Sequence, residues 1–169
     1  MKEVAQLLLA MRAAGVISEY ALFGAVAQMR YTEAVATLDA DVLVALAPSG
    51  GLDILKPIYD FCAARGFHPE GEGVRVGAWP VQFIPAFNPL TWDALHQAEV
   101  EEFEGAPLRV VSATYLAVIA LSTGRPKDRM RILALIEAGR VTPEAVGDLA
   151  GRYGLSEAWR RFKTRFLDD

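Results

Sequence analysis

The sequence has a single cysteine among its 169 residues, Cys62. One cysteine excludes an intramolecular disulfide and leaves no cysteine cluster to hold zinc. The neighbours of Cys62 are Phe61, Ala63 and Ala64, which are typical of a packed side chain rather than of a reactive thiol. A reduced, cytoplasmic setting fits this composition best.

The sequence also lacks a hydrophobic run long enough to cross a membrane. One of the longest, residues 115–121, is far shorter than the roughly 18 residues that a membrane-spanning helix needs. Near the N-terminus, Glu3 and Gln6 stand where a signal peptide has an unbroken apolar segment. We therefore expect a cytoplasmic protein that does not interact with membranes.

Apolar residues, in contrast, are plentiful. They make up 53% of the sequence, against 22% charged residues, and the mean hydropathy is +0.23. Such a composition excludes intrinsic disorder, and a chain of this length is large enough to fold around one well-filled core. The surplus of apolar residues is also compatible with a contact in a homo-oligomer or with a partner protein.

The formal net charge of −4 is divided unevenly along the chain. Residues 1–106 contain 6 Lys or Arg against 14 Asp or Glu, whereas residues 107–169 contain 11 against 7. This asymmetry fits a cation site in the first part and an anion site in the second, or an ordinary solvated surface. No dense basic run interleaved with aromatic residues predicts nucleic-acid binding.

Hydrophobic periodicity predicts an α/β core followed by helices. We expect helices over residues 2–14 and 53–65, a strand over 38–46, a hairpin over 73–85 and further strands near 99–103 and 108–111. Four helices follow, at residues 114–121, 126–138, 143–152 and 156–166. The predicted organisation is a core over residues 1–107 and a helical segment over 108–169 that packs on it as one structural domain.

Two acidic residues, Asp39 and Asp41, lie near the start of the predicted strand 38–46. Residues i and i+2 of a strand point to the same face, so we expect the two carboxylates to project together. Carboxylates held so close repel each other unless a cation neutralises them, and Mg²⁺ is a natural partner. The alternative is two solvated acids at an exposed strand start.

A glycine upstream of this pair, Gly24, separates the apolar run 20–23 from a helical pattern at 25–29. Glycine permits a tight bend between a strand and a helix, and a helix that begins there offers free N–H groups to a phosphate. Such a turn, followed 15 residues later by an Asp-x-Asp strand, is typical of the nucleotidyltransferase superfamily.

Further motifs extend this similarity over roughly residues 16–136. They are Tyr20-Ala-Leu-Phe-Gly-Ala-Val-Ala, Tyr31-Thr-Glu, Thr37-x-Asp-x-Asp and Gly124-Arg-Pro-Lys-Asp128. With them the chain resembles the AbiEii-type branch, which is known from abortive-infection and toxin–antitoxin systems. The resemblance implies an α+β fold with a small mixed sheet flanked by helices and a helical C-terminal segment.

The resemblance also implies a reaction and its residues. A nucleotidyl group passes from a nucleoside triphosphate to a hydroxyl of RNA, protein or a small molecule, with Mg²⁺ as the cofactor. Asp39 and Asp41 are the expected catalytic residues and metal ligands. The expected nucleotide-binding residues are Gly24, Ala25, Arg125 and Lys127. For the two cations the alternative is a solvated first helical turn, in which Asp128 favours the helix N-terminus.

Three positions depart from the family pattern. Ala25 replaces the usual Gly or Ser, Gln82 occupies the position of a third carboxylate, and Ala120 stands where relatives often carry lysine. A glutamine can ligate a metal through its carbonyl oxygen, but it brings no charge and takes no proton. Residues that might replace the missing carboxylate are Glu33, Glu70 and Glu72. We also expect Gln82 to lie on the strand next to the Asp-x-Asp strand, with a hydrogen-bond partner.

Two functions are therefore compatible with the sequence. The first is a magnesium-dependent nucleotidyltransferase. The second is a nucleotidyltransferase-fold module without catalytic activity that binds a partner in a toxin–antitoxin-type system.

The last predicted helix presents two contrasting faces. Leu155, Trp159, Phe162 and Phe166 form an apolar stripe, which we expect to be core or an oligomer contact. The opposite face is basic and fits either RNA or solvent; its residues are Arg160, Arg161, Lys163 and Arg165.

Overall fold

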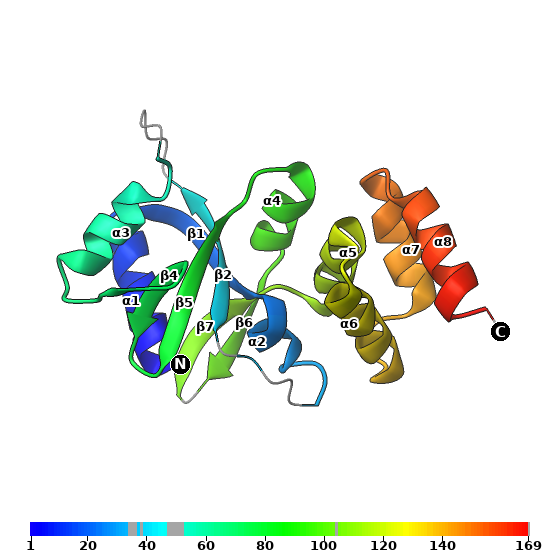
Figure 1. The fold of residues 1–169 in the computed structure, drawn as a ribbon, viewed down its shortest axis with the longest axis horizontal. Helices are drawn as coiled ribbons and strands as arrows, with labels where there is room; N and C mark the ends of the chain where they lie inside the picture. Colours follow the sequence, from blue (N-terminus) through cyan, green and yellow to red (C-terminus); the bar gives the residue numbers. More distant parts are fainter. Residues whose placement is uncertain (34–36, 38, 47–52, 104, 169) are drawn as a thin grey trace. The chain divides into compact units, whose positions relative to one another are not determined.

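The computed structural model of the chain describes residues 1–33, 37, 39–46, 53–103 and 105–168 (Figure 1). The chain divides into two compact units, one formed by Met1–Ala27 with Ala36–Val111 and the other by Gln28–Val35 with Ser112–Asp169. The first unit contains the sheet, and the second is helical. No helix among the described residues is long and apolar enough to span a membrane.

In the described part of the chain, seven strands form one mixed sheet in the order β3-β4-β5-β2-β1-β7-β6. The strands are β1 (Ile17–Phe23), β2 (Ala40–Leu46), β3 (Pro69–Glu70), β4 (Gly73–Val76), β5 (Trp79–Pro85), β6 (Glu99–Phe103) and β7 (Ala106–Val110). β1 and β2 are antiparallel, whereas β2 pairs with β5, and β1 with β7, in parallel. The predicted α+β class with a mixed sheet is confirmed.

The pairing register assigns each side chain of the central strands to one face. Phe23 lies opposite Asp41, and Asp41 lies opposite Gln82. Directly opposed residues point to the same side of a sheet, so these three share a face. The neighbouring positions Leu22 and Val42 point to the other face and are completely buried.

Helices cover both faces of the sheet. The helices that begin in this unit are α1 (Lys2–Ala13), α2 (Gly24–Gln28), α3 (Lys56–Ala63) and α4 (Pro89–His96). Tyr59 of α3 meets Phe83 edge to face, with ring centroids 6.5 Å apart, on the face that carries Leu22 and Val42. α4 packs against β1 and β2 and lies across the sheet from α3 (Figure 1). The face that carries Asp41 is therefore the face on which α4 lies.

Two predicted boundaries are wrong, in both cases because a side chain binds the backbone locally. The strand predicted over residues 38–46 begins at Ala40, and Leu38 lies outside the described residues. The Thr37 hydroxyl donates to the backbone oxygen of Asp39 at 2.9 Å, which competes with strand pairing. The predicted helix 53–65 shortens to α3, because the Asp53 carboxylate accepts the Leu55 N–H at 3.1 Å and forms a turn.

The second unit contains the helices α5 (Ala113–Thr123), α6 (Pro126–Glu137), α7 (Pro143–Arg152) and α8 (Ser156–Phe166). Its buried side chains include Leu116, Ile132, Leu135, Trp159 and Phe162. α5 ends at Gly124, whose φ of 65° is the left-handed conformation that glycine adopts at helix ends. Pro126 then begins α6, where a missing N–H costs no helical hydrogen bond.

One arginine of the first unit ties α4 to the sheet. Arg109 of β7 forms an ion pair with Glu19 of β1, and its other amino group lies 3.1–3.3 Å from carbonyl oxygens of Leu95, His96 and Ala98. Leu95 and His96 belong to the last turn of α4, where carbonyls are exposed at the helix end, and Ala98 follows that turn. The guanidinium therefore holds the end of the helix and neutralises a half-buried carboxylate.

We predict that Arg109→Met lowers the free energy of unfolding by about 2–3 kcal/mol, because it removes the less exposed cation that pairs with Glu19 and a donor to three carbonyls. Arg12→Met is the matched control, since Arg12 pairs with the same Glu19 from a side chain that is 49% exposed. An exposed pair contributes at most about 1 kcal/mol. Urea denaturation measures both variants, and equal losses would contradict the assigned role of Arg109.

Candidate functional site

In the candidate site, the carboxylate of Asp41 packs directly against the backbone of Gly24. Gly24 directly follows β1, has a φ of 65° and is buried. A Cβ atom on this residue would lie 2.1 Å from Oδ2 of Asp41, far inside van der Waals contact. Glycine is favoured here, because another residue would be strained at this φ and its side chain would have to displace the carboxylate.

Gln82 lies beside this pair, as the sequence predicts. It is the direct neighbour of Asp41 across the parallel β2–β5 pair, and its side chain is partly exposed. Its amide nitrogen donates to Oε2 of Glu72 at 3.0 Å. Asp39 and Gln82 both line a hollow of about 260 Å³, together with Glu70 and Glu72. Gln82 therefore neighbours Asp41 in the sheet and shares a cavity with Asp39.

The acids of this hollow differ in what they already bind. Glu70 is held by the guanidinium of Arg75 through two hydrogen bonds of 2.5 and 2.6 Å. Glu72 accepts from the neutral amide of Gln82 and keeps its charge uncompensated by that contact. Glu33 belongs to the second unit. Of the two glutamates that line the hollow, Glu72 is the one that binds the side chain of Gln82.

The donor atoms suit magnesium only in part. No group of three or more His, Cys, Asp or Glu within the described residues is arranged to hold a metal ion. Asp39, Asp41 and the carbonyl oxygen of Gln82 are oxygen donors, the type that Mg²⁺ prefers. Protein sites commonly bind Mg²⁺ through one or two carboxylates and complete its shell with water and substrate phosphates. These residues fit an ion that binds together with a triphosphate, rather than a preformed cage.

The predicted phosphate contacts of Gly24 and Ala25 have less support from the helix that follows them. α2 has only five residues, and its dipole is correspondingly small. Gly24 is buried and Ala25 is partly exposed. Phosphate binding at these two residues stays a prediction.

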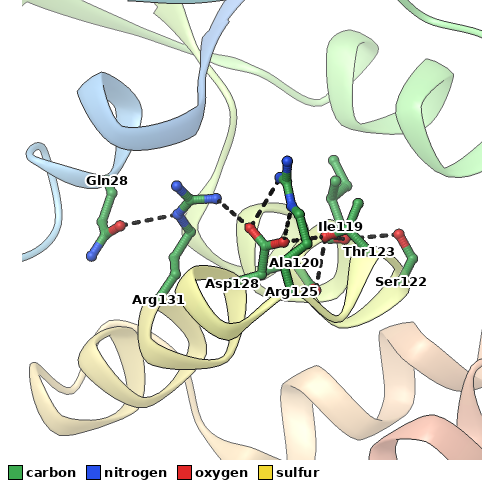
Figure 2. Close-up of polar contacts among 8 residues, drawn as sticks. All are labelled: Gln28, Ile119, Ala120, Ser122, Thr123, Arg125, Asp128 and Arg131. Carbon is green, nitrogen blue, oxygen red and sulfur yellow. Dashed lines mark hydrogen bonds and ion pairs between the residues drawn. The ribbon is translucent and has the colours of Figure 1, made fainter. Parts of the chain in front are cut away.

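Arg125 and Lys127 lie in different surroundings. Nε of Arg125 is 2.6 Å from Oδ2 of Asp128 (Figure 2), and the arginine side chain is 56% exposed. Lys127 is exposed, and no carboxylate in the described segments forms an ion pair with it. Lys127 is the more available cation, while Arg125 already compensates a buried charge.

Asp128 is the centre of a buried network that sequence analysis missed. Its carboxylate, 1% exposed, accepts from Thr123 at 2.8 Å and from Arg131 at 3.3 Å, besides Arg125. Arg131 also donates to the side chain of Gln28 at 3.0 Å (Figure 2). Burial alone raises the pKa of Asp128, but the hydrogen bonds and positive charges of its neighbours outweigh burial, and the pKa is lowered.

The comparisons with known proteins concern the fold. No protein-family model matches the sequence, and no curated protein matches it. The solution structure of the antibiotic-resistance factor ANT(2'')-Ia is similar over 98% of this chain and 99% of its own, at 15% identity and a TM-score of 0.52. A nucleotidyltransferase-like protein from Paracoccidioides brasiliensis is similar over 93% and 90%, at 14% identity and a TM-score of 0.51. The fold is nucleotidyltransferase-like.

This fold confirms the general resemblance that the motifs indicate, while the AbiEii-type branch stays a prediction. Within the nucleotidyltransferase-like sheet, the register brings Gly24, Asp41 and Gln82 together. Ala120, where the resemblance predicts lysine, is 2% exposed and supplies no cation.

We predict that Gly24→Ala destabilises the protein more than Gly15→Ala does. Both glycines have a positive φ, but a Cβ on Gly15 would meet nothing within 4 Å. Conformational strain costs each variant about 1–2 kcal/mol. Gly24→Ala must also displace the Asp41 carboxylate, which adds roughly 1–3 kcal/mol. Urea denaturation compares the two, and equal losses would show that the carboxylate moves aside freely.

We predict that Asp128→Asn lowers the free energy of unfolding by roughly 3 kcal/mol at neutral pH, because it removes a buried negative charge that pairs with the largely buried Arg131. A lowered pKa stabilises the fold above the ordinary value of 3.8, and this contribution disappears as the pH falls through the lowered pKa. The gap between parent and variant should therefore shrink below that value.

The control for this prediction is Asp148→Asn, which removes an exposed carboxylate from α7. It should change the unfolding free energy by less than about 0.5 kcal/mol at any pH. A gap for Asp128→Asn that stays constant through the acid range would contradict the role of the charge.

Proposed function

We propose that this protein is a magnesium-dependent nucleotidyltransferase that moves a nucleotidyl group from a nucleoside triphosphate to a hydroxyl acceptor. The observation that supports the proposal best is the Asp41 carboxylate held against Gly24, with Gln82 in register beside it. This contact lies on the partly exposed face of a nucleotidyltransferase-like sheet. RNA, a protein or a small molecule carries the acceptor hydroxyl.

The acidic residues have a common role in this proposal. Asp39 and Asp41 hold the cation, and the exposed Lys127 supplies positive charge to the phosphates. Bound Mg²⁺ would neutralise the triphosphate and favour the departure of pyrophosphate. β2 and β5 keep Asp41 and Gln82 on a rigid support, which fixes their geometry relative to Gly24.

The proposed base for the reaction is Glu72, because the amide of Gln82 cannot take a proton. As the acceptor oxygen bonds to the α-phosphorus, the bond from that phosphorus to the pyrophosphate oxygen breaks, and the acceptor hydroxyl must lose its proton. An amide takes no proton. The carboxylate of Glu72, 3.0 Å from the Gln82 nitrogen and lining the same hollow as Asp39, is the proposed base.

A second function remains, in which the fold is a partner-binding module without catalysis. It is favoured by Gln82 in place of a third carboxylate and by the buried Ala120 in place of a lysine. In this case the acids at the hollow are surface charges, and the partner belongs to a toxin–antitoxin-type system.

We predict that Asp39→Asn combined with Asp41→Asn abolishes magnesium-dependent triphosphate binding, because the cation loses both anionic ligands. Isothermal titration calorimetry with each nucleoside triphosphate and Mg²⁺ measures the loss. The charge-matched control is Glu144→Gln with Asp148→Asn, two exposed acids of α7, and it should bind as the parent does. Equal triphosphate affinity in both double variants would show that Asp39 and Asp41 do not bind the metal ion.

A transfer assay with labelled triphosphates and cell extract distinguishes the two functions when it is applied to the variants Gln82→Asp and Glu72→Gln. For the enzyme, Gln82→Asp adds an anion that tightens Mg²⁺ binding and raises transfer, and Glu72→Gln lowers transfer without weakening triphosphate binding. For the partner-binding module, neither substitution produces or alters transfer.

A further inference from the structure

A cavity of about 260 Å³ lies between α5, α6 and α8, wholly within the helical unit. Its lining includes three arginines and an apolar group: Arg129, Arg161, Arg165, Ile132, Phe162 and Phe166. Of the positions discussed for the candidate site, Ala120 lines this cavity, whereas Gly24, Asp39, Asp41, Gln82, Arg125 and Lys127 do not. The cavity therefore has a chemistry of its own, cationic at the rim and apolar at the floor.

The positive charge of the cavity is largely uncompensated. No carboxylate lines it. In the described part of the chain neither Arg129 nor Arg165 forms an ion pair, and Arg161 is 3.6 Å from Glu157, which also binds Arg160. Guanidinium groups that share a cavity without anions favour an anionic ligand, and their planar fork matches phosphate.

The apolar floor includes an accessible aromatic surface. Phe162 is buried, whereas Phe166 is 37% exposed, and their ring centroids are 5.0 Å apart. The guanidinium of Arg165 lies 5.4 Å from the centre of the Phe166 ring. An exposed ring beside a guanidinium offers a stacking surface to a planar group such as a nucleobase.

A second hollow of about 380 Å³ adjoins this cavity and extends the basic surface along α8. Its lining is Glu157, Arg160, Arg161, Thr164 and Arg165, so the two hollows share Arg161 and Arg165. One hollow offers a ring and an apolar floor, and the other offers only polar groups. This succession suits a chain of linked nucleotides better than a single small anion.

We propose that this surface binds single-stranded nucleic acid, with phosphates on Arg129, Arg161 and Arg165 and a base against Phe166. The geometry follows the general pattern of single-strand binding, in which a cationic groove holds the backbone and aromatic rings stack on bases. The inference does not rest on the proposed function, since the surface needs no metal, no triphosphate and no catalysis.

The test is fluorescence anisotropy of a labelled single-stranded oligonucleotide of about ten nucleotides, a typical site size for such grooves, in the presence of a metal chelator. The parent should bind the strand more tightly than duplex of the same sequence and more tightly than mononucleotides. Arg129→Gln with Arg165→Gln should weaken binding and reduce the slope of log affinity against log salt by about 1.4, or 0.7 per lost phosphate contact.

Matched variants test whether strand binding depends on this surface or only on the net charge of the protein. Arg65→Gln with Arg152→Gln removes the same charge from exposed positions outside the cavity and should keep most of the affinity and the salt slope. Phe166→Ala should weaken binding about 5-fold or more through lost stacking. Phe87→Ala removes a ring that is 77% exposed outside the cavity and should change nothing.

Several results would overturn the proposal. They are absence of strand binding by the folded parent, mononucleotide affinity equal to that of the strand, or equal losses in the cavity and control variants. The outcome is independent of the metal site, because Asp39→Asn with Asp41→Asn should leave strand binding unchanged. A protein that binds the strand but no triphosphate would retain this inference and lose the proposed enzyme.

Discussion

The contact between the Asp41 carboxylate and the backbone of Gly24 constrains the remainder of the candidate site. It requires a left-handed residue without a side chain directly after β1, and it requires the register that sets Phe23 opposite Asp41. A slip of one residue would turn Asp41 toward the buried face and bring an apolar side chain to Gly24. Because β5 pairs in parallel with β2, the same register also determines where Gln82 lies.

The helical unit depends on a different kind of constraint, the cost of burying a charge. Asp128 is buried, and its carboxylate is compatible with the core because Thr123, Arg125 and Arg131 all donate to it. Arg125 and Arg131 therefore stabilise the buried carboxylate, whereas Lys127 and Arg129 do not pair with it. Within a short basic segment, neighbouring cations thus have separate roles, which their spacing alone does not distinguish.

The sequence predicts the α+β class and most helices, because hydrophobic periodicity is a local property. The neighbouring positions of Asp41 and Gln82, which lie on separate strands, are expected from the resemblance to nucleotidyltransferases. The sequence places the start of β2 too early, since a Thr37 hydroxyl bond competes with strand pairing. It misses the two-residue strand β3 and the network around Asp128, which depends on Arg131 meeting Gln28, 103 positions away in the chain. Contacts between distant segments leave no periodic signal. The Arg125-x-x-Asp128-x-x-Arg131 spacing is the one local sign of that network.

The positive φ at Gly24 has a stereochemical consequence. The two α-hydrogens of this glycine are not equivalent in the folded chain, because a Cβ atom in the L-configuration would lie 2.1 Å from the Asp41 oxygen. For D-residues the favoured backbone region is the mirror image, so a φ of 65° suits them, and their Cβ atom takes the position of the other hydrogen. Glycine, which has no side chain and no chirality, is the one genetically encoded amino acid that avoids both the backbone strain and the overlap with Asp41.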